Sequence, residues 1–395
     1  MINFVGFLNK CSLKVVSSKS YGLLVFIWLF FLLACVKESS GVDSMDAIEF
    51  AVADYDAVVK GSELTTDNIN SFGVFAALEE GNDGFDSVDS DLLQPFMIDV
   101  PVTRKDGKWA ATPQHYWPIL QDKYLSFFAY APHSAGTGIS AKAGWEKESG
   151  VSEPKTVEVT YTLDSNPAKH VDLCVASAVL DRARDNDGDG KSDPIVFDFK
   201  HTLASVSFAA NYIGTLPEGC YLRIDELVVG KMVNTNKLVY NSEKKDYFTW
   251  DPITLDTVRD GSYVLNIGSR TLSSNQPIIK KSDNSSGEVT YTDFVTTNGL
   301  IYALPQEVNP VGRPIITKID VTFSYVKTES DAPIAQFYTS VDLPNSTLIV
   351  ARKYKYLFTL DVTNTSLISI SCVDTGAWII DWKNSNNSHS DTLIK

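Results

Sequence analysis

Four aspartates in one short segment have the residue types and the spacing of a calcium site. The segment reads DNDGDGKSD. Three of its aspartates fall at positions 1, 3 and 5 of a calcium-binding loop, and a fourth falls at position 9. Gly190 stands where such a loop turns sharply, and carboxylate oxygens are ligands that Ca²⁺ prefers. The sequence therefore predicts a structural Ca²⁺ site whose ligands are Asp185, Asp187, Asp189 and Asp193.

The same segment departs from a helix-flanked calcium loop in two respects. Position 12 is Val196 rather than a bidentate glutamate, and the flanking residues alternate as strands do. A solvated acidic turn without a bound ion is the alternative interpretation. If a metal binds here, we expect it to pin a hairpin, and we expect no other cofactor.

No comparable pattern indicates catalysis. The five histidines include no H-x-H or H-E-x-x-H spacing, and the chain has no G-x-S-x-G, G-x-x-x-x-G-K or G-x-G-x-x-G motif. His201 follows a segment with strand-like alternation, which predicts a partly buried structural residue. We therefore predict that the protein is not an enzyme.

The N-terminal region has the composition of an export signal. An apolar run spans residues 22–36, and it is shorter than the roughly 20 residues that a membrane-spanning helix needs. Three lysines precede the run, and no acidic residue occurs before Glu38. A positive head, a short apolar core and a small residue at its end are typical of a secretory signal peptide.

The end of this apolar run reads LLAC and resembles the bacterial lipobox, in which the cysteine is lipidated before the signal is cut. Residues 1–34 are thus predicted to be a lipoprotein signal peptide, Cys35 the lipidation site, and residues 35–45 an anchor linker. Two or more acyl chains hold a protein firmly in a membrane. An ordinary secretory signal with a chance cysteine is the alternative.

The charge of the exported chain argues against nucleic acid as a partner. The sequence has 34 basic and 49 acidic residues, and residues 1–34 contain three lysines and no acidic residue. The mature chain would therefore carry 31 basic and 49 acidic residues, a net charge of −18. Affinity for nucleic acid comes from neutralising phosphates with lysine and arginine, so we expect no such partner.

Alternation of apolar and polar residues is the main structural pattern. It is clearest in TKIDVTFSY (317–325), YKYLFTLDV (354–362) and ISISC (368–372). A period of two with β-branched and aromatic residues predicts half-buried strands. Many short strands between turn residues indicate an all-β fold of the β-sandwich type.

Two strand-rich halves of similar length meet in YIGTLPEGC. Gly214, Pro217 and Gly219 interrupt the strand pattern there. We therefore predict two β-sandwich domains in tandem, over residues 46–215 and 216–395.

The alternation changes phase within FDFKHTLASVSF (197–208). The residues of the apolar face occupy odd positions up to His201 and even positions from Ala204. One extra residue in a strand shifts its faces in this way, so we predict a β-bulge near Thr202–Leu203.

Three cysteines follow the anchor. They are Cys174, Cys220 and Cys372. We predict buried free thiols that behave as small apolar residues, and one disulfide among the three is the alternative.

Aromatic residues are dense between residues 106 and 132. They include Trp109, His115, Tyr116, Trp117, Tyr124, Phe127, Phe128 and Tyr130. Core and inter-strand packing is the favoured interpretation, because such rings bury large areas. A sugar-stacking platform is the alternative. Exposed tryptophans flanking a groove would favour the platform, and buried ones would favour packing.

Six segments occur in the order seen in fimbrillin-like proteins of Bacteroides-type bacteria. They are GKWAATPQHYWP, LSFFAYAP, DLCVAS, FDFKHTLASVSF, YKYLFTLDV and WIIDW. With the lipobox, the resemblance covers nearly the whole chain. It implies two transthyretin-like or immunoglobulin-like β-sandwich domains, and a subunit of a surface fimbrium that is exported to the outer membrane as a lipoprotein.

The resemblance also implies a mode of assembly. Many such subunits are trimmed by an Arg-specific protease, which frees the groove of an N-terminal strand, and a neighbouring subunit fills that groove with its own strand. SLISISC (366–372) and AWIIDW (377–382) are candidate donor or groove-closing segments, or ordinary strands. This chain departs from the pattern because no arginine lies between Cys35 and Arg104. We therefore favour an anchor, accessory or tip subunit that keeps its first strand.

These observations predict a surface lipoprotein that serves in fimbrial assembly and cell adhesion. Its expected partners are other fimbrial subunits, the outer membrane through the lipid anchor, and host or bacterial surface ligands. The alternative is a glycan-binding surface lipoprotein with an aromatic platform.

Overall fold

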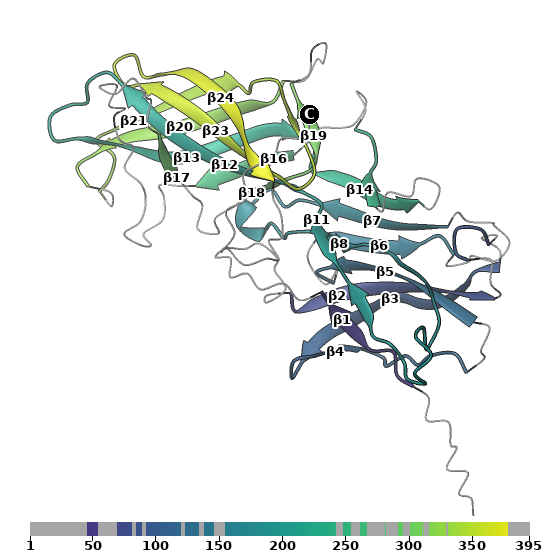
Figure 1. Cartoon of the computed structure of the whole chain (residues 1–395). Coiled ribbons are helices and arrows are strands. Elements are labelled where there is room, and N and C mark those ends of the chain that lie inside the picture. Colours follow the sequence, from purple (N-terminus) through teal and green to yellow (C-terminus); the bar gives the residue numbers. More distant parts are fainter. Residues whose placement is uncertain are drawn as a thin grey trace, which may run out of the picture. The chain divides into compact units, whose positions relative to one another are not determined.

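The structure is a computed structural model. It describes residues 46–53, 69–80, 84–88, 92–119, 123–133, 138–145, 155–241, 248–253, 261–266, 281, 291–294, 301–309, 311, 316–328 and 331–377. The predicted signal peptide, Cys35 and the linker to residue 45 lie outside these residues. The chain divides into two compact units, residues 1–46 and 47–395, and the architecture that follows is that of the second unit (Figure 1). Among the described residues, the structure has no helix that is long and apolar enough to span a membrane.

The first part of this unit is built on a nine-stranded sheet. Its strands follow the order β10-β1-β4-β3-β2-β5-β8-β11, and β9 pairs with β5 outside this path. The strands are β1 (Phe50–Val52), β2 (Ser71–Glu80), β3 (Gln94–Lys105), β4 (Lys108–Ala111), β5 (Lys123–Ala131), β8 (Cys174–Ala176), β9 (Val179–Arg182), β10 (Ile195–Phe197) and β11 (Phe199–His201).

The two end strands of this sheet are consecutive in the chain. β10 ends at Phe197 and β11 begins at Phe199, so only Asp198 separates them. The sheet therefore curls back on itself and encloses one hydrophobic core, to which β1, β3, β5 and β10 all contribute. Phe50 of β1 lies in that core, stacked on Phe197 at 6.1 Å between ring centroids.

A second sheet covers the outer face of β2 and β5. It has the order β15-β14-β7-β6, with β6 (Ile139–Ala143), β7 (Thr156–Thr162), β14 (Thr235–Asn241) and β15 (Phe248–Trp250). Alternation along β2 explains the arrangement, because Phe72 faces the enclosed core and Phe75 faces the second sheet. The ring of Phe128 in β5 packs against Tyr240 in β14, with centroids 4.6 Å apart.

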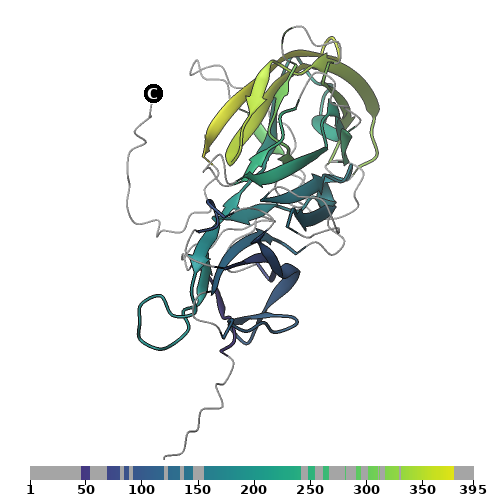
Figure 2. The same ribbon diagram turned by 90° about the vertical axis from the view of Figure 1, so that its right-hand side faces the viewer.

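Most of the remaining strands form two further sheets, which appear in teal to yellow in Figure 2. One has the order β17-β12-β23-β24 with β18 paired to β12, and the other has the order β16-β13-β20-β21. The bounds of the first are β12 (Ala204–Ile213), β17 (Thr292–Phe294), β18 (Ile301–Ala303), β23 (Arg352–Asp361) and β24 (Ser366–Ala377). Those of the second are β13 (Tyr221–Met232), β16 (Gly261–Asn266), β20 (Lys318–Val326) and β21 (Ala335–Asp342). A short ribbon pairs β19 (Gln306–Val308) with β22 (Ser346–Leu348), and η2 (Pro167–Lys169) is a single 3₁₀ turn.

These two sheets share a hydrophobic core, as a β-sandwich requires. The predicted apolar faces of residues 317–325 and 354–362 are both fully buried, which confirms the period-two prediction. A hydrogen bond from the hydroxyl of Tyr325 to the carbonyl oxygen of Val362, 2.5 Å long, links one sheet to the other. The predicted all-β fold is confirmed.

Strand pairing crosses the predicted domain boundary between residues 215 and 216. β12 precedes that boundary yet pairs with β23 over Ser205–Ile213. β14 follows it yet pairs with β7. Residues before and after position 215 thus share two sheets. The division into domains of residues 46–215 and 216–395 stays a prediction.

The predicted β-bulge near Thr202–Leu203 is wrong. β11 ends at His201 and β12 begins at Ala204, and these strands belong to different sheets. The phase of the alternation changes because the chain leaves one sheet and enters another. The backbone N–H of Thr202 donates to the carbonyl oxygen of Leu173 at 3.0 Å and fixes this transfer point.

Candidate functional site

The acidic loop lies between β9 and β10. The carboxylate of Asp185 accepts hydrogen bonds from the backbone N–H groups of Gly188 and Gly190, each at 2.7 Å. The hydrogen bond from Gly190 is the main cause that lowers the pKa of Asp185 below its ordinary value. Carboxylate oxygens of Asp185, Asp187 and Asp189 all lie within 4.8 Å of one another.

The fourth predicted ligand does not join this group. Asp193 instead accepts hydrogen bonds from the backbone and the side-chain amide of Asn186, at 3.2 and 3.3 Å. It also lies 4.0 Å from the guanidinium of Arg182. Three of the four predicted ligands are brought together, and calcium binding itself stays a prediction.

Removal of calcium gives this prediction a direct test. If the three gathered carboxylates hold the ion, added Ca²⁺ should raise the melting temperature of the protein relative to EDTA. At 100 times the dissociation constant the stabilisation is about 2.7 kcal/mol. The effect should disappear in Asp187→Asn and persist in Asp193→Asn. Equal calcium responses in the two variants, measured by scanning calorimetry, would contradict it.

The aromatic residues between 106 and 132 are mostly packed inside. Trp117 is 3% exposed and meets Phe127 edge-on at 6.1 Å, and Phe127, Phe128 and Tyr130 are buried. Trp109 is half-buried against Phe72, with centroids 4.9 Å apart. His115 and Tyr124 are half-buried, and Tyr116 is 42% exposed. The two tryptophans therefore do not form an exposed pair, and packing is their main role.

The first described segment is a strand inside the nine-stranded sheet. β1 pairs in parallel with β10 and in antiparallel with β4, so it is flanked on both sides. The backbone N–H of Ile48 donates to the carbonyl oxygen of His115 at 2.9 Å. Ile48, Phe50 and Val52 are between 2% and 8% exposed. This segment closes the core enclosed by the nine-stranded sheet.

The first arginine after Cys35 lies in a hairpin. Arg104 is exposed near the end of β3, and Asp106 and Gly107 form the turn into β4 with φ angles of 51° and 79°. Asp-Gly with both φ angles positive is the usual chemistry of a two-residue hairpin turn. The guanidinium carbon of Arg104 lies 5.9 Å from the ring centroid of Trp109. A cut there would open β3–β4 rather than release β1.

β24 is the last described strand and the end strand of its sheet. It pairs with β23 over ten register positions, and among the described strands no other pairs with it. Ile370 and Cys372 are half-buried against the core, and Val373 is 41% exposed. SLISISC is thus part of an in-chain strand, and one edge of that strand pairs with no other strand in the described part of the chain. Most of AWIIDW, residues 378–382, lies outside the described residues.

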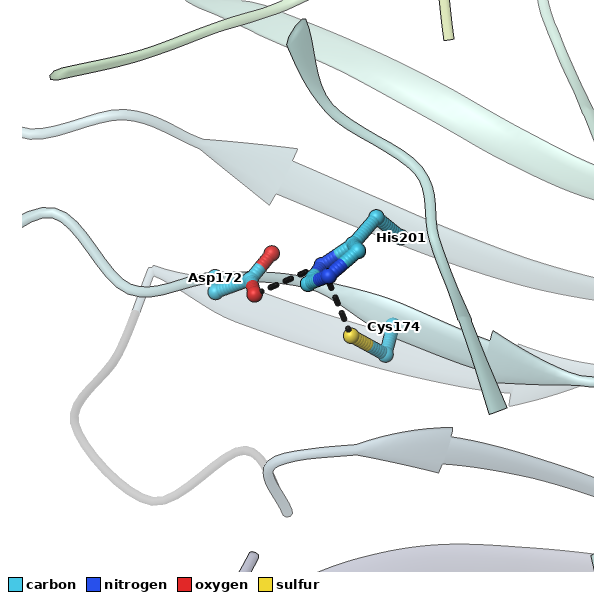
Figure 3. Close-up of side chains that lie close together, drawn as sticks. All are labelled: Asp172, Cys174 and His201. Carbon is cyan, nitrogen blue, oxygen red and sulfur yellow. Dashed lines mark hydrogen bonds and ion pairs between the residues drawn. The ribbon is translucent and has the colours of Figure 1, made fainter. Parts of the chain in front are cut away.

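A cluster that the sequence did not reveal lies between β8 and β11. The carboxylate of Asp172 is 2.8 Å from Nδ1 of His201, and the Sγ atom of Cys174 is 3.6 Å from the same nitrogen (Figure 3). The three side chains are at most 3% exposed. His201 was predicted to be partly buried and is almost fully buried. Its partners follow from the register of β8 and β11, which the sequence does not display.

This cluster is unsuited to nucleophilic catalysis. A Cys-His-Asp relay needs the thiol and the carboxylate on different ring nitrogens, whereas both face Nδ1 here. Burial also raises the pKa of the Cys174 thiol well above its ordinary value, and reactive cysteines have lowered values. Cys174, Cys220 and Cys372 are free thiols in this structure, as predicted, but only Cys174 is buried, and the other two are half-buried.

A buried glutamate in β2 was also not predicted. Glu79 is 1% exposed, and its Oε1 accepts a hydrogen bond from the hydroxyl of Ser126 at 2.6 Å. Burial, followed by the nearby carboxylate of Asp181, raises the pKa of Glu79 to about 7. β2 is apolar at both odd and even positions before Glu79, so alternation gave no sign that this carboxyl group is buried.

Glu79 should make stability depend on pH in a defined direction. Its pKa is higher in the folded state, so folding takes up a proton, and wild-type stability gains as pH falls from 7 toward 4.5. Glu79→Gln mimics the protonated acid and should lose this gain. Between about pH 8 and pH 4, the difference in unfolding free energy between variant and wild type should change by up to about 3 kcal/mol. Urea titrations across that range measure it, because other titrating groups cancel in the difference. A constant difference would contradict the prediction.

One comparison with known proteins identifies a family, and another finds solved structures of similar fold. A family model described as fimbrillin-like matches residues 58–378. A solved fimbrial protein from Bacteroides vulgatus has 19% sequence identity and a TM-score of 0.58, with 84% of this chain and 99% of that chain covered. A protein assigned to cell adhesion from Bacteroides uniformis has 15% identity and a TM-score of 0.42, covering 85% of this chain and 99% of its own. No curated protein matches the chain.

Proposed function

Because the chain belongs to the fimbrillin-like family, we propose that it is a surface-exposed outer-membrane lipoprotein and a subunit of a fimbrium. In this proposal Cys35 carries the lipid anchor, and the protein acts in fimbrial assembly and cell adhesion. Its partners are other fimbrial subunits and ligands on host or bacterial surfaces. Its position is that of an anchor, accessory or tip subunit.

The seated first strand is the observation that carries this role. Ile48, Phe50 and Val52 fill the core, and no arginine lies between Cys35 and Arg104 at which an Arg-specific protease could release them. An intact first strand leaves the N-terminal groove closed to a donated strand. The subunit would therefore stay joined to its lipid anchor.

The edge of β24 that pairs with no other described strand supplies a place for a neighbouring subunit. An edge strand presents unpaired N–H and C=O groups, and an extended segment of another chain can satisfy them by β-strand addition. Every second side chain of the added strand would pack beside Ile370 and Cys372, which are half-buried on the core side of β24. Strand addition at this edge is consistent with a subunit that receives a partner without being trimmed.

The glycan-binding alternative has less support. It depended on Trp109 and Trp117 flanking an exposed groove, and Trp117 is buried against Phe127. We therefore favour assembly and adhesion through protein contacts over sugar stacking.

Intact mass and N-terminal analysis of the protein from its native membrane test the proposal. We expect a lipidated N-terminus at Cys35 and no further cleavage. Cys35→Ser should release the protein from the outer membrane, whereas the matched variant Cys11→Ser should leave it anchored. A start beyond residue 53, with recovery in high-mass fibres, would overturn the anchored role and indicate a trimmed, polymerising subunit.

A further inference from the structure

Three chemically different side chains converge on one point in the core. Figure 3 shows Asp172 and Cys174 both directed at the ring of His201, and both contacts end on Nδ1. A nitrogen, a sulfur and an oxygen therefore lie together, away from solvent, with Cys174 at 0%, Asp172 at 1% and His201 at 3% exposure. One ligand atom from each of the three side chains lies within 4.8 Å of the other two, which is close enough for all three to bind one ion.

The backbone holds these three groups in place. Cys174 and His201 are directly opposite in the antiparallel pairing of β8 and β11. Asp172 lies two residues before Cys174, so in extended chain both side chains fall on the same side. The backbone N–H and the hydroxyl of Thr202 both donate to the carbonyl oxygen of Leu173, at 3.0 and 2.7 Å. The two segments are thus tied together beside the cluster.

The distances suit a metal that accepts nitrogen and sulfur. With bonds of about 2.0–2.1 Å to nitrogen and about 2.3 Å to sulfur, two ligands of a tetrahedral Zn²⁺ lie roughly 3.5 Å apart. Nδ1 and Sγ are 3.6 Å apart. The 2.8 Å between Nδ1 and the carboxylate of Asp172 would have to widen by about half an ångström, to the roughly 3.3 Å of zinc-bound nitrogen and oxygen.

We propose that Asp172, Cys174 and His201 form a structural binding site for a divalent transition-metal ion of the Zn²⁺ class. The thiol excludes Ca²⁺ and Mg²⁺ as the preferred ions, because these take oxygen ligands. Binding requires the thiolate, so the thiol proton passes to solvent as the ion enters. The carboxylate and the thiolate then balance the charge of the ion within a buried site.

This site is separate from the acidic loop and from the proposed fimbrial role. Its ligands are buried, so the ion must enter while the chain folds or opens. The full mature chain should therefore be unfolded with a denaturant and EDTA, freed of both, and refolded with or without Zn²⁺. Metal content after gel filtration is measured by plasma mass spectrometry, and Co²⁺ serves as the spectroscopic probe.

The expected result is about one Zn²⁺ retained per wild-type chain, and a melting temperature that rises with Zn²⁺ concentration. Cys174→Ser should lose most of that metal. The matched thiol variant Cys220→Ser, and the acidic-loop variant Asp185→Asn, should keep it. Wild-type protein with Co²⁺ should show a thiolate-to-metal absorption band, and that result stands even if Cys174→Ser fails to fold.

Three outcomes would overturn the proposal. They are a refolded wild type that retains no metal, a folded Cys174→Ser variant that retains as much as wild type, and bound Co²⁺ without a thiolate band. The last two would assign the metal to surface groups.

Discussion

Replacing His201 by alanine should lower the free energy of unfolding by about 3–5 kcal/mol. The reason is that Asp172 would then remain at 1% exposure without the imidazole that lies 2.8 Å from its carboxylate. Removing one partner of a buried pair leaves a carboxylate in a medium of low dielectric, which is far less favourable than leaving it in water. Urea unfolding of metal-free protein, followed by tryptophan fluorescence, measures the loss.

The neighbouring lysine provides a matched control. Lys200 precedes His201 in β11, but its side chain is 59% exposed and lies 3.8 Å from Asp198 on the surface. Exposed pairs of this kind contribute about 0–1 kcal/mol, so Lys200→Ala should be nearly neutral. Equal losses in the two variants would show that the strand, and not the buried pair, carries the effect.

The second large effect is expected in the first strand. Phe50→Ala should destabilise the protein by about 3–5 kcal/mol, as deletion of a buried aromatic ring typically does. The ring of Phe50 lies among Phe72, Phe127 and Phe197, with centroid distances of 6.1–6.3 Å. Its removal leaves a cavity among three aromatic rings that the surrounding strands cannot easily close.

This substitution also tests whether the first strand is a structural part of the mature protein. Glu49 is the exposed neighbour of Phe50, and its backbone carbonyl oxygen accepts a hydrogen bond from the N–H of Ile195. Glu49→Ala keeps this backbone hydrogen bond and should change the stability little. Thermal unfolding of both variants, with limited proteolysis of the N-terminal region, would distinguish them. If Phe50→Ala is as stable as Glu49→Ala, the groove does not depend on β1 for closure.

The sequence determines the faces of the strands well. Period-two alternation correctly predicts the buried faces of β20 and β23, because each of these strands has one face on a shared core. The Asp-Gly turn between β3 and β4 also follows from local chemistry, since both residues tolerate positive φ. These features depend on neighbours in the chain.

Features that depend on distant pairing were not predictable in the same way. The phase change near Thr202 was visible, but a bulge and a transfer between sheets give the same alternation. The Asp172–His201 pair requires knowledge that β8 lies beside β11. The spacing of the acidic loop indicated four ligands, whereas Asp193 is engaged by Asn186 because the loop turns back on itself. Sequence spacing alone does not show which aspartate carboxylate accepts a hydrogen bond from each backbone N–H of the loop.

Two parallel pairs among the described strands have a consequence for how fast the chain folds. β1 pairs with β10 through Phe50 and Ile195, and β12 pairs with β23 through Ser205 and Lys353, so each contact closes a loop well over a hundred residues long. Loop-closure entropy must be overcome before such contacts form, which places β-rich folds of this kind in the range of about milliseconds to seconds. During synthesis, which starts at the N-terminus, the nine-stranded sheet can be completed once residue 201 has left the ribosome. β12 must wait for β23, near the far end of the chain, before its sheet can form.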